Sequence, residues 1–138
     1  AGGKEGIFNR AYDAKRYWLH NSNTVHHTFW DMLVFKKLRR SLGFENCRLM
    51  VTGAAPIASH VLEFLRIAFG CAVVEGYGST ECCAAGFVTD ATQFNRVGDV
   101  GTPVPCSEVR LEAVEEMGYL PSDTLHGKGD NVVTCRGR

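Results

Sequence analysis

The residues with the clearest chemical potential lie in one stretch, residues 73–87, which reads VVEGYGSTECCAAGF. A pair of valines is typical of a buried strand, and the Gly-Tyr-Gly break at 76–78 turns the backbone where few other residues fit. The Tyr77 ring offers a flat face for stacking. The Thr80 hydroxyl can donate to an anionic oxygen, and the Glu81 carboxylate is a hard-oxygen ligand suited to magnesium. The alternative interpretation is a strand, a tight turn and a solvated glutamate.

A loop of small residues is expected beside this stretch. The spacing of apolar residues and of Gly and Pro breaks predicts a short buried strand at 47–52 and a turn with the sequence GAAP at 53–56. A largely buried helix at 58–69 and a second strand at 72–75 should follow. This unit has the length of a β-α-β crossover, so its strands should be parallel. Parallel strands place both loops at one edge of the sheet, where open α/β sheets bind ligands. A plain turn between strand and helix is the alternative for GAAP.

Further elements are predicted on both sides of this unit. Upstream, residues 1–6 are expected to be a frayed end, and the periodicity of apolar residues predicts helices at 7–20 and 29–42. Downstream, alternating apolar and polar residues predict a strand at 108–114 and a final short strand at 131–135. The turn-rich segment between them, at 117–130, is predicted to be a surface loop.

The order of these elements predicts an α/β fold. We expect residues 1–138 to belong to one domain, with a parallel-sheet β-α-β portion at about 7–87 and a smaller β-rich portion at about 88–138.

Charge and cysteine content narrow the class of protein. The chain of 138 residues carries 15 basic and 15 acidic side chains, a balance that argues against nucleic acid or an anionic membrane surface as the main partner. Its six cysteines form no C-x-x-C pair, so reduced thiols in a reducing compartment are expected. The histidines lack ligand spacing for zinc. With no initiator Met, signal peptide or apolar run long enough to span a membrane, the chain is expected to be a piece of a longer polypeptide.

Other chemistries fit these residues less well. Ser79 stands one place too late for the G-x-S-x-G motif of serine hydrolases. No G-x-G-x-x-G segment opens a helix after a strand, which argues against a dinucleotide site. Cys82 and Cys83 are interpreted as core or wall residues and not as nucleophiles.

The motif E-G-Y-G-S-T-E at 75–81 resembles the YGxTE motif of the adenylate-forming enzymes. Longer segments narrow the resemblance to the long-chain fatty acyl-CoA synthetases, namely FNRAYDAKRYW at 8–18, WDMLVFKKLRRSLG at 30–43, RLMVTGAAPIASHVLEFLRIAFGC at 48–71 and VGTPVPCSEVRLEAVEEMGY at 100–119. The chain is similar to the centre of the large N-terminal domain of these ligases.

This resemblance implies a two-step reaction with MgATP and coenzyme A. The carboxylate of a long-chain fatty acid attacks the α-phosphorus of ATP, giving acyl-adenylate and pyrophosphate, and the thiol of coenzyme A then displaces AMP. Such a reaction builds negative charge on phosphate, which magnesium and fixed donors can stabilise.

The resemblance also implies roles for particular residues. The nucleotide-binding set would be Gly53, Ala54, Ala55, Pro56, Glu75, Gly76, Tyr77, Gly78, Ser79 and Thr80. Within it, Tyr77 would stack on adenine and Thr80 would contact phosphate, while Glu81 would hold magnesium, so that Thr80 and Glu81 are the catalytic pair. The acyl-binding residues would be Gly76, Gly78 and Ala84. Ser79 is expected to lie along the adenylate without a chemical role of its own.

Several functional motifs and residues of the family are absent from this sequence, including the phosphate loop and the catalytic lysine of the small C-terminal domain. The isolated chain is therefore expected to be inactive. An intracellular location is expected, on the cytosolic face of membranes or in an organelle such as the peroxisome or endoplasmic reticulum, with peripheral membrane association of the parent. The alternatives are an inert or self-associating fragment that exchanges strands, and a different adenylate-forming ligase. The last segment departs from the family's G-E-I-x-x-R-G-P pattern, which leaves the register after Leu120 open.

Overall fold

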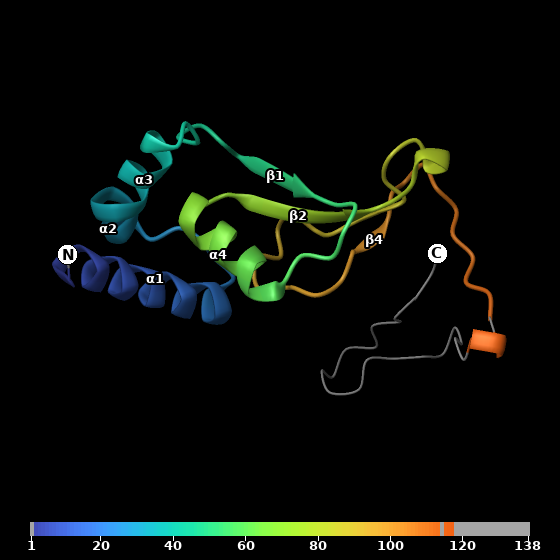
Figure 1. Ribbon diagram of the computed structural model, residues 1–138, viewed down its shortest axis with the longest axis horizontal. Helices are drawn as coiled ribbons and strands as arrows, with labels where there is room; N and C mark the ends of the chain where they lie inside the picture. Colours follow the sequence, from blue (N-terminus) through green and yellow to red (C-terminus); the bar gives the residue numbers. More distant parts are fainter. Residues whose placement is uncertain (1, 114, 118–138) are drawn as a thin grey trace. The chain divides into compact units, whose positions relative to one another are not determined.

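The computed structural model describes residues 2–113 and 115–117. The chain divides into two compact units, Ala1–Val104 and Pro105–Arg138. The first unit contains the helices α1 to α4 and the strands β1 to β4, and it carries both loops singled out above (Figure 1).

The predicted β-α-β unit is confirmed. Strand β1 (Leu49–Thr52) leads through the GAAP loop into α4 (Ser59–Phe69), and strand β2 (Ala72–Tyr77) follows. The strands pair in parallel, with Leu49 opposite Ala72 and Thr52 opposite Glu75. Gly70 ends α4 in the left-handed conformation, with φ of 61°, which glycine adopts at little cost.

Two very short strands extend the sheet. Strand β3 (Phe87–Val88) pairs antiparallel with β2, and β4 (Thr102–Pro103) pairs antiparallel with β3. The order is β1-β2-β3-β4, so the sheet is mixed. The chain thus has the expected α/β fold, and β1 forms one edge of the sheet within the described part of the chain.

The two upstream helices form with boundaries that differ from prediction. Helix α1 spans Gly2–Ser22 and so includes most of the segment expected to be frayed. The second helical segment consists of α2 (Thr28–Trp30), a π-helical turn (Asp31–Phe35) and α3 (Lys36–Ser41). Its continuous backbone bonding confirms a helix over this region, and the π turn is a detail that apolar periodicity does not report.

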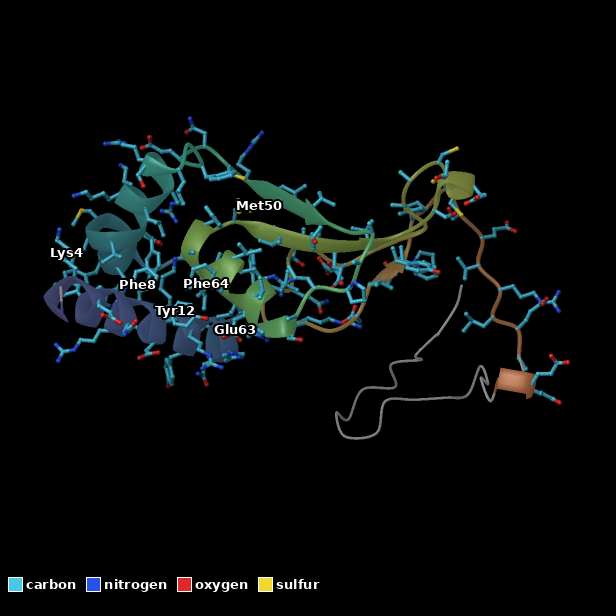
Figure 2. The ribbon with its side chains drawn as sticks, in the orientation of Figure 1. Lys4, Phe8, Tyr12, Met50, Glu63 and Phe64 are labelled. Carbon is cyan, nitrogen blue, oxygen red and sulfur yellow. The ribbon has the colours of Figure 1, made fainter. Side chains whose placement is uncertain are left out.

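The helices pack together on one side of the sheet (Figure 1). The main buried cluster consists of Ala11, Leu19, Val25, Phe35, Ile67 and Ala68. Figure 2 shows Phe8 and Tyr12 on α1 near Phe64 of α4, and the rings of Tyr12 and Phe64 lie 5.9 Å apart. Aromatic side chains therefore pack between α1 and α4.

The prediction of a buried strand is wrong for β1, and the helix predicted to be largely buried, α4, is buried only in part. Leu49 and Val51 on β1 are 52% and 70% exposed, and Val61 and Phe64 on α4 are 37% and 40% exposed. Helix α4 packs against β2, so the side chains that alternate to the other face of β1 remain uncovered in the described part of the chain.

Two cations from other helices reach the C-terminal end of α4. Lys15 Nζ donates to the carbonyl oxygen of Ile67 at 2.7 Å, and Arg39 Nη1 donates to that of Phe69 at 3.2 Å. Both cations also contact Asp31 Oδ1, at 2.7 and 3.3 Å. The last carbonyls of a helix lack partners within the helix and carry its negative dipole end. These hydrogen bonds to carbonyl groups therefore tie α1 and α3 to α4.

The second unit has little regular structure among its described residues. A 3₁₀ turn spans Glu115–Met117. Residues 108–113 are not a strand, so that prediction is wrong there; alternating side chains form a strand only where a neighbouring strand supplies hydrogen-bond partners. The predicted strand at 131–135 and most of the predicted loop at 117–130 lie outside the described residues.

Candidate functional site

The two predicted loops meet at one edge of the sheet. Because β1 and β2 are parallel, β1 ends at Thr52 on the side where β2 continues past Glu75 to Tyr77. The predicted break at Gly76 and Tyr77 is wrong, because these two residues stay in β2 and pair with β3, and the strand ends before Gly78. The backbones come close there, since a Cβ atom placed on Gly53 would lie 3.1 Å from the carbonyl oxygen of Gly76. A larger side chain on Gly53 would push the loops apart.

A cavity of about 360 Å³ opens between these loops. This volume falls in the range of about 300–1,000 Å³ that small-molecule sites occupy. The residues from the predicted set that line it are Ala54, Ala55, Pro56, Glu75, Gly76, Tyr77 and Gly78. The remaining predicted residues, Gly53, Ser79, Thr80, Glu81 and Ala84, do not belong to its lining.

Glu75 and Tyr77 present very different surfaces to this cavity. Glu75 is 7% exposed, and its carboxylate Oε1 accepts a long hydrogen bond of 3.4 Å from the amide of Ile57. Its own amide donates to the hydroxyl of Thr89 at 2.8 Å, which locks the carboxyl end of β2. The Tyr77 ring is 44% exposed and tilts at 59° against Phe87, with ring centroids 6.0 Å apart. A supported but accessible ring is well placed to stack on a flat ligand.

The turn that follows β2 carries the predicted catalytic residues on an exposed surface. Thr80 and Glu81 lie in a 3₁₀ turn at Thr80–Cys82. The Glu81 backbone amide and the Ser79 hydroxyl hold the pKa of the Glu81 carboxyl below its ordinary value, so it is ionised at neutral pH. Cys82 and Cys83 are also exposed, and their interpretation as core or wall residues is wrong in this structure because the turn projects away from the sheet.

Gly78 is required by the packing of this turn. A Cβ atom on Gly78 would overlap the carbonyl oxygen of Ala84. We expect Gly78→Ala to lower the free energy of unfolding by about 1–3 kcal/mol, as overpacking does elsewhere, in a urea titration. Gly86→Ala is the matched control, because its Cβ atom would make an ordinary contact 3.8 Å from the carbonyl oxygen of Tyr77. Equal losses for the two variants would contradict the steric argument.

A third segment completes the cavity and was missed by the sequence analysis. Its lining residues are Gly98, Asp99 and Val100, and Ile57 adds a further wall. The carboxylate of Asp99 accepts bonds from Arg96 Nε at 2.6 Å and from the amide of Gly101 at 2.8 Å. The glycine spacing in VGDVG was a signal of a tight loop, but it did not say which loop would close on the site.

Arg66 connects this third segment to the sheet. It is 2% exposed, and its guanidinium donates to the carbonyl oxygen of Val73 on β2, with the shorter bond at 2.9 Å. It also donates to the carbonyl oxygens of Phe94 and Arg96, at 2.9 and 2.5 Å. Fixing residues 94–96 positions the Gly98–Val100 wall that follows in the chain.

The described residues contain no group of three or more His, Cys, Asp and Glu side chains arranged to hold a metal ion by themselves. Within the same part of the chain, no helix combines the length and apolar character needed to cross a membrane.

Comparison with known proteins places these loops in a family. Residues 17–133 match the family described as AMP-binding enzyme. The chain is 42% identical over 132 residues to long-chain-fatty-acid–CoA ligase 5 of Rattus norvegicus, covering 94% of this chain and 19% of that protein. It is 42% identical over 131 residues to the peroxisomal long chain acyl-CoA synthetase 6 of Arabidopsis thaliana, covering 94% and 18%.

A third relative is long-chain-fatty-acid–CoA ligase 1 of Homo sapiens, 41% identical over 130 residues, with 94% of this chain and 18% of that protein covered. The chain therefore spans about a fifth of the length of these relatives. No solved structure matches it. The family match extends over most of the chain, and it includes both loops that line the cavity. The chain belongs to the AMP-binding enzyme family.

Proposed function

We propose that this chain is part of an ATP-dependent long-chain fatty acid–CoA ligase. The ligase forms an acyl-adenylate with release of pyrophosphate, and then forms acyl-CoA with release of AMP. The chain supplies one wall of the adenylate site and is inactive in isolation. Intracellular location, in an organelle such as the peroxisome or at the cytosolic face of a membrane, is part of this proposal.

The observation that carries the proposal is the convergence of the GAAP loop and the GYG segment on one cavity of about 360 Å³. It occurs in a chain that is 42% identical to a long-chain-fatty-acid–CoA ligase over 132 residues. Small side chains on both loops let a flat ring approach the backbone closely. A purine pressed between these loops would have the Tyr77 ring available for stacking.

Each residue of the site then has a role suited to its surroundings. The buried Glu75 carboxylate accepts hydrogen bonds and faces the cavity, where a nucleotide amino group can donate to it. The Thr80 hydroxyl, exposed on the turn, donates to a phosphate oxygen. Gly53 and Gly76 keep the loops close together, while Gly76, Gly78 and Ala84 leave room for the acyl chain. Ser79 orients the turn through its hydroxyl near Glu81.

Glu81 fits a magnesium ligand by the chemistry of its donor atoms. Its carboxylate is exposed and has a lowered pKa, so it offers a negative oxygen at neutral pH. Magnesium in nucleotide sites is bound through one or two carboxylates together with substrate phosphates. When bound, the ion would neutralise charge that develops on the phosphates. The protein residues meanwhile orient the carboxylate of the fatty acid toward the α-phosphorus and exclude water.

Replacing Glu81 by alanine tests the proposal directly. We expect Glu81→Ala to reduce fatty-acid-dependent ATP–pyrophosphate exchange by the ligase that contains this chain at least about a hundredfold, the scale seen when one electrostatic stabiliser is removed from an active site. Because Glu81 is exposed, the free energy of unfolding should change by less than about 0.5 kcal/mol. The exchange is measured with acids from short to long chain length, and activity should peak with the long ones.

Glu45→Ala is the matched control, since Glu45 is an exposed carboxylate bound to Arg40 at 2.8 Å and lies away from the cavity. Unchanged exchange in Glu81→Ala would exclude the metal role. A peak with short acids or amino acids would favour a different adenylate-forming ligase. No exchange with any acid would favour a self-associating module joined through the exposed edge strand β1.

A further inference from the structure

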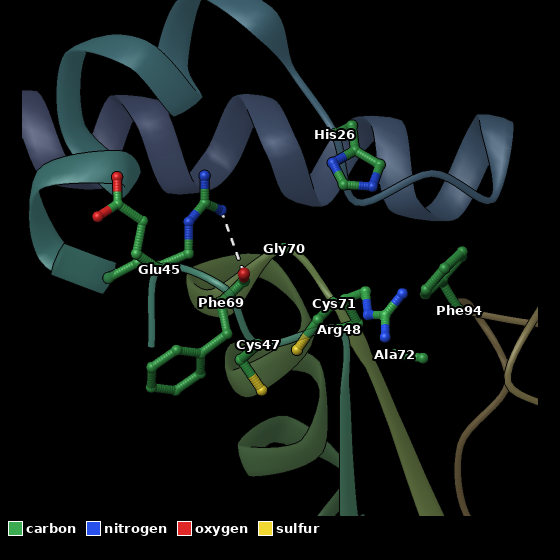
Figure 3. A pocket seen from close by; sticks show the side chains of 10 residues that line it. His26, Glu45, Cys47, Arg48, Phe69, Gly70, Cys71, Ala72 and Phe94 are labelled. Carbon is green, nitrogen blue, oxygen red and sulfur yellow. Dashed lines mark hydrogen bonds between the residues drawn. The ribbon is translucent and has the colours of Figure 1, made fainter. Parts of the chain in front are cut away.

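A second cavity, of about 420 Å³, lies at the opposite ends of β1 and β2 from the candidate site. Figure 3 shows it from close by, with Cys47, Cys71, Arg48 and Phe69 among its lining residues (Figure 3). The chain enters β1 just after Cys47 and enters β2 just after Cys71. Neither loop of the adenylate site reaches this cavity, so it is independent of the proposed ligase function.

The two cysteines meet across neighbouring strand ends. Leu49 on β1 pairs with Ala72 on β2. Cys47 lies two positions before Leu49, and Cys71 lies one position before Ala72. Cys47 packs against the buried cluster formed by Leu62, Cys71 and Val73. Figure 3 shows the two sulfur atoms projecting into the same region below the strand entrances. The two thiols are within hydrogen-bond reach of each other, so the side chains are close enough for a disulfide to be considered.

The two thiols differ in accessibility. Cys71 is 5% exposed, and burial, together with the neighbouring Cys47, raises the pKa of its thiol to about 11. Cys47 is half-buried at the cavity wall, with its Sγ 3.5 Å from the carbonyl oxygen of Leu49. An external reagent therefore meets Cys47 first, and Cys71 stands behind it as a protonated thiol.

The charges around the cavity favour an anionic reagent. Arg48, an exposed side chain, lines the cavity beside Cys47 together with Arg39 and His26. The carboxylate of Glu45 also lines it, but Arg40 neutralises that group through two hydrogen bonds, at 2.8 and 3.1 Å. Nearby guanidinium groups attract negatively charged partners.

We propose that Cys47 and Cys71 form a thiol–disulfide exchange site for a small anionic disulfide of the glutathione disulfide class. The Cys47 thiolate attacks one sulfur of the disulfide, which breaks the S–S bond, forms a mixed disulfide and releases one glutathione thiolate that takes up a proton. Cys71 then loses its proton and attacks the Cys47 sulfur, which forms the Cys47–Cys71 bond and releases the second glutathione. The dithiol is oxidised by two electrons, and glutathione disulfide is reduced to two glutathione molecules.

The order of these steps follows from the environment of Cys71. In the dithiol, the neighbouring Cys47 adds to the effect of burial and disfavours ionisation of Cys71. Once Cys47 is held in a mixed disulfide it can no longer ionise, so that part of the penalty disappears. Attack by the second thiol is intramolecular and is favoured by its fixed position.

The test uses the chain with Cys82, Cys83, Cys106 and Cys135 changed to serine, so that only the proposed pair remains. This background is needed because Cys71, Cys82 and Cys83 share one tryptic peptide, which follows Arg66. After incubation with glutathione disulfide, the intact mass should fall by two hydrogen atoms. Digestion should then yield a linked pair of peptides, one holding Cys47 and the other Cys71.

Two single variants in this background separate the steps. Cys71→Ser should accumulate a stable mixed disulfide on Cys47, whereas Cys47→Ser should leave Cys71 unmodified at the same time point. Arg48→Gln should slow the first step several-fold with anionic glutathione disulfide, but not with the neutral disulfide of 2-mercaptoethanol. Two bound glutathiones per chain, or an unmodified pair under conditions that oxidise a free dithiol, would overturn the proposal.

Discussion

Replacing Lys15 by methionine is expected to lower the free energy of unfolding by about 3–5 kcal/mol, the cost of breaking a buried ion pair by removing one partner. The Lys15 side chain is fully buried, with its Nζ atom 2.7 Å from Asp31 Oδ1 and 2.7 Å from the carbonyl oxygen of Ile67. The ammonium group also lies 4.4 Å from the centre of the Phe35 ring. Methionine keeps most of the side-chain volume and removes only the charged donor.

The cost arises because both oxygen partners would remain buried. Burial lowers the pKa of Lys15, while the bond to Asp31 opposes that shift. For Asp31, burial would raise the pKa, but Lys15, the His27 amide and Arg39 together hold it below its ordinary value. Both pKa values are therefore lowered, which favours the charged form of Asp31 and disfavours that of Lys15, the more buried partner of this closed pair. Losing the ammonium leaves Asp31 with Arg39 and the His27 amide, and leaves the Ile67 carbonyl without this donor.

Lys4→Met is the matched control, because Lys4 lies on the same helix and is exposed. It should change the free energy of unfolding by less than about 0.5 kcal/mol. Urea titrations followed by circular dichroism measure both variants. Equal midpoints for Lys15→Met and Lys4→Met would mean that the Lys15 ammonium is solvated. Its bonds to Asp31 and to the Ile67 carbonyl would then contribute nothing to the free energy of unfolding.

The second large effect is expected for Arg66→Met, with a loss of about 3 kcal/mol in the free energy of unfolding. Hydrogen bonds from a charged donor contribute about 1.5–3 kcal/mol each, and carbonyl groups left buried without a donor add a penalty. Arg66 donates to the carbonyl oxygens of Val73, Phe94 and Arg96. One side chain thus joins α4, β2 and the segment that leads into the third wall of the cavity.

This variant should also loosen the site locally. The amide of Gly101 is bonded to Asp99 Oδ1 at 2.8 Å, in the loop that Arg66 supports through its bonds to Phe94 and Arg96. We expect amide hydrogen exchange over residues 97–101 to become faster in Arg66→Met, beyond the change caused by lower global stability. Amides of α1 serve as the internal reference.

Arg16→Met is the control for Arg66, since Arg16 is 56% exposed and its ion pair with Glu63, at 2.7 Å, lies at the surface. Such a pair contributes about 0–1 kcal/mol. Arg66→Lys should recover only part of the loss, because an ammonium cannot reach three carbonyl groups in the planar arrangement of a guanidinium. Unchanged exchange over residues 97–101 would show that Arg66 stabilises α4 and β2 without positioning the site loop.

Local sequence was sufficient for the β-α-β unit and for the meeting of its two loops. The apolar runs, the GAAP break and the αL glycine at position 70 follow from short-range steric rules, whereas Gly76 and Tyr77 stay in β2 because β3 pairs with them. The helical crossover between the two strands then makes β1 and β2 parallel, so the loops must share an edge. For the same reason the sequence predicts that residues 54–56 and 75–78 lie together, and they line one cavity.

Only the tertiary structure decided which distant residues complete and support the site. The sequence alone does not show that Lys15 and Arg66 are buried, because burial of a charge depends on carbonyl groups and carboxylates that other elements bring to it. The Asp99 loop joins the cavity through such long-range bonds. The strand predicted at 108–114 illustrates the converse, since alternation specifies a face but not a partner. Sequence determined the local conformations and their order, and packing decided where charge could be buried.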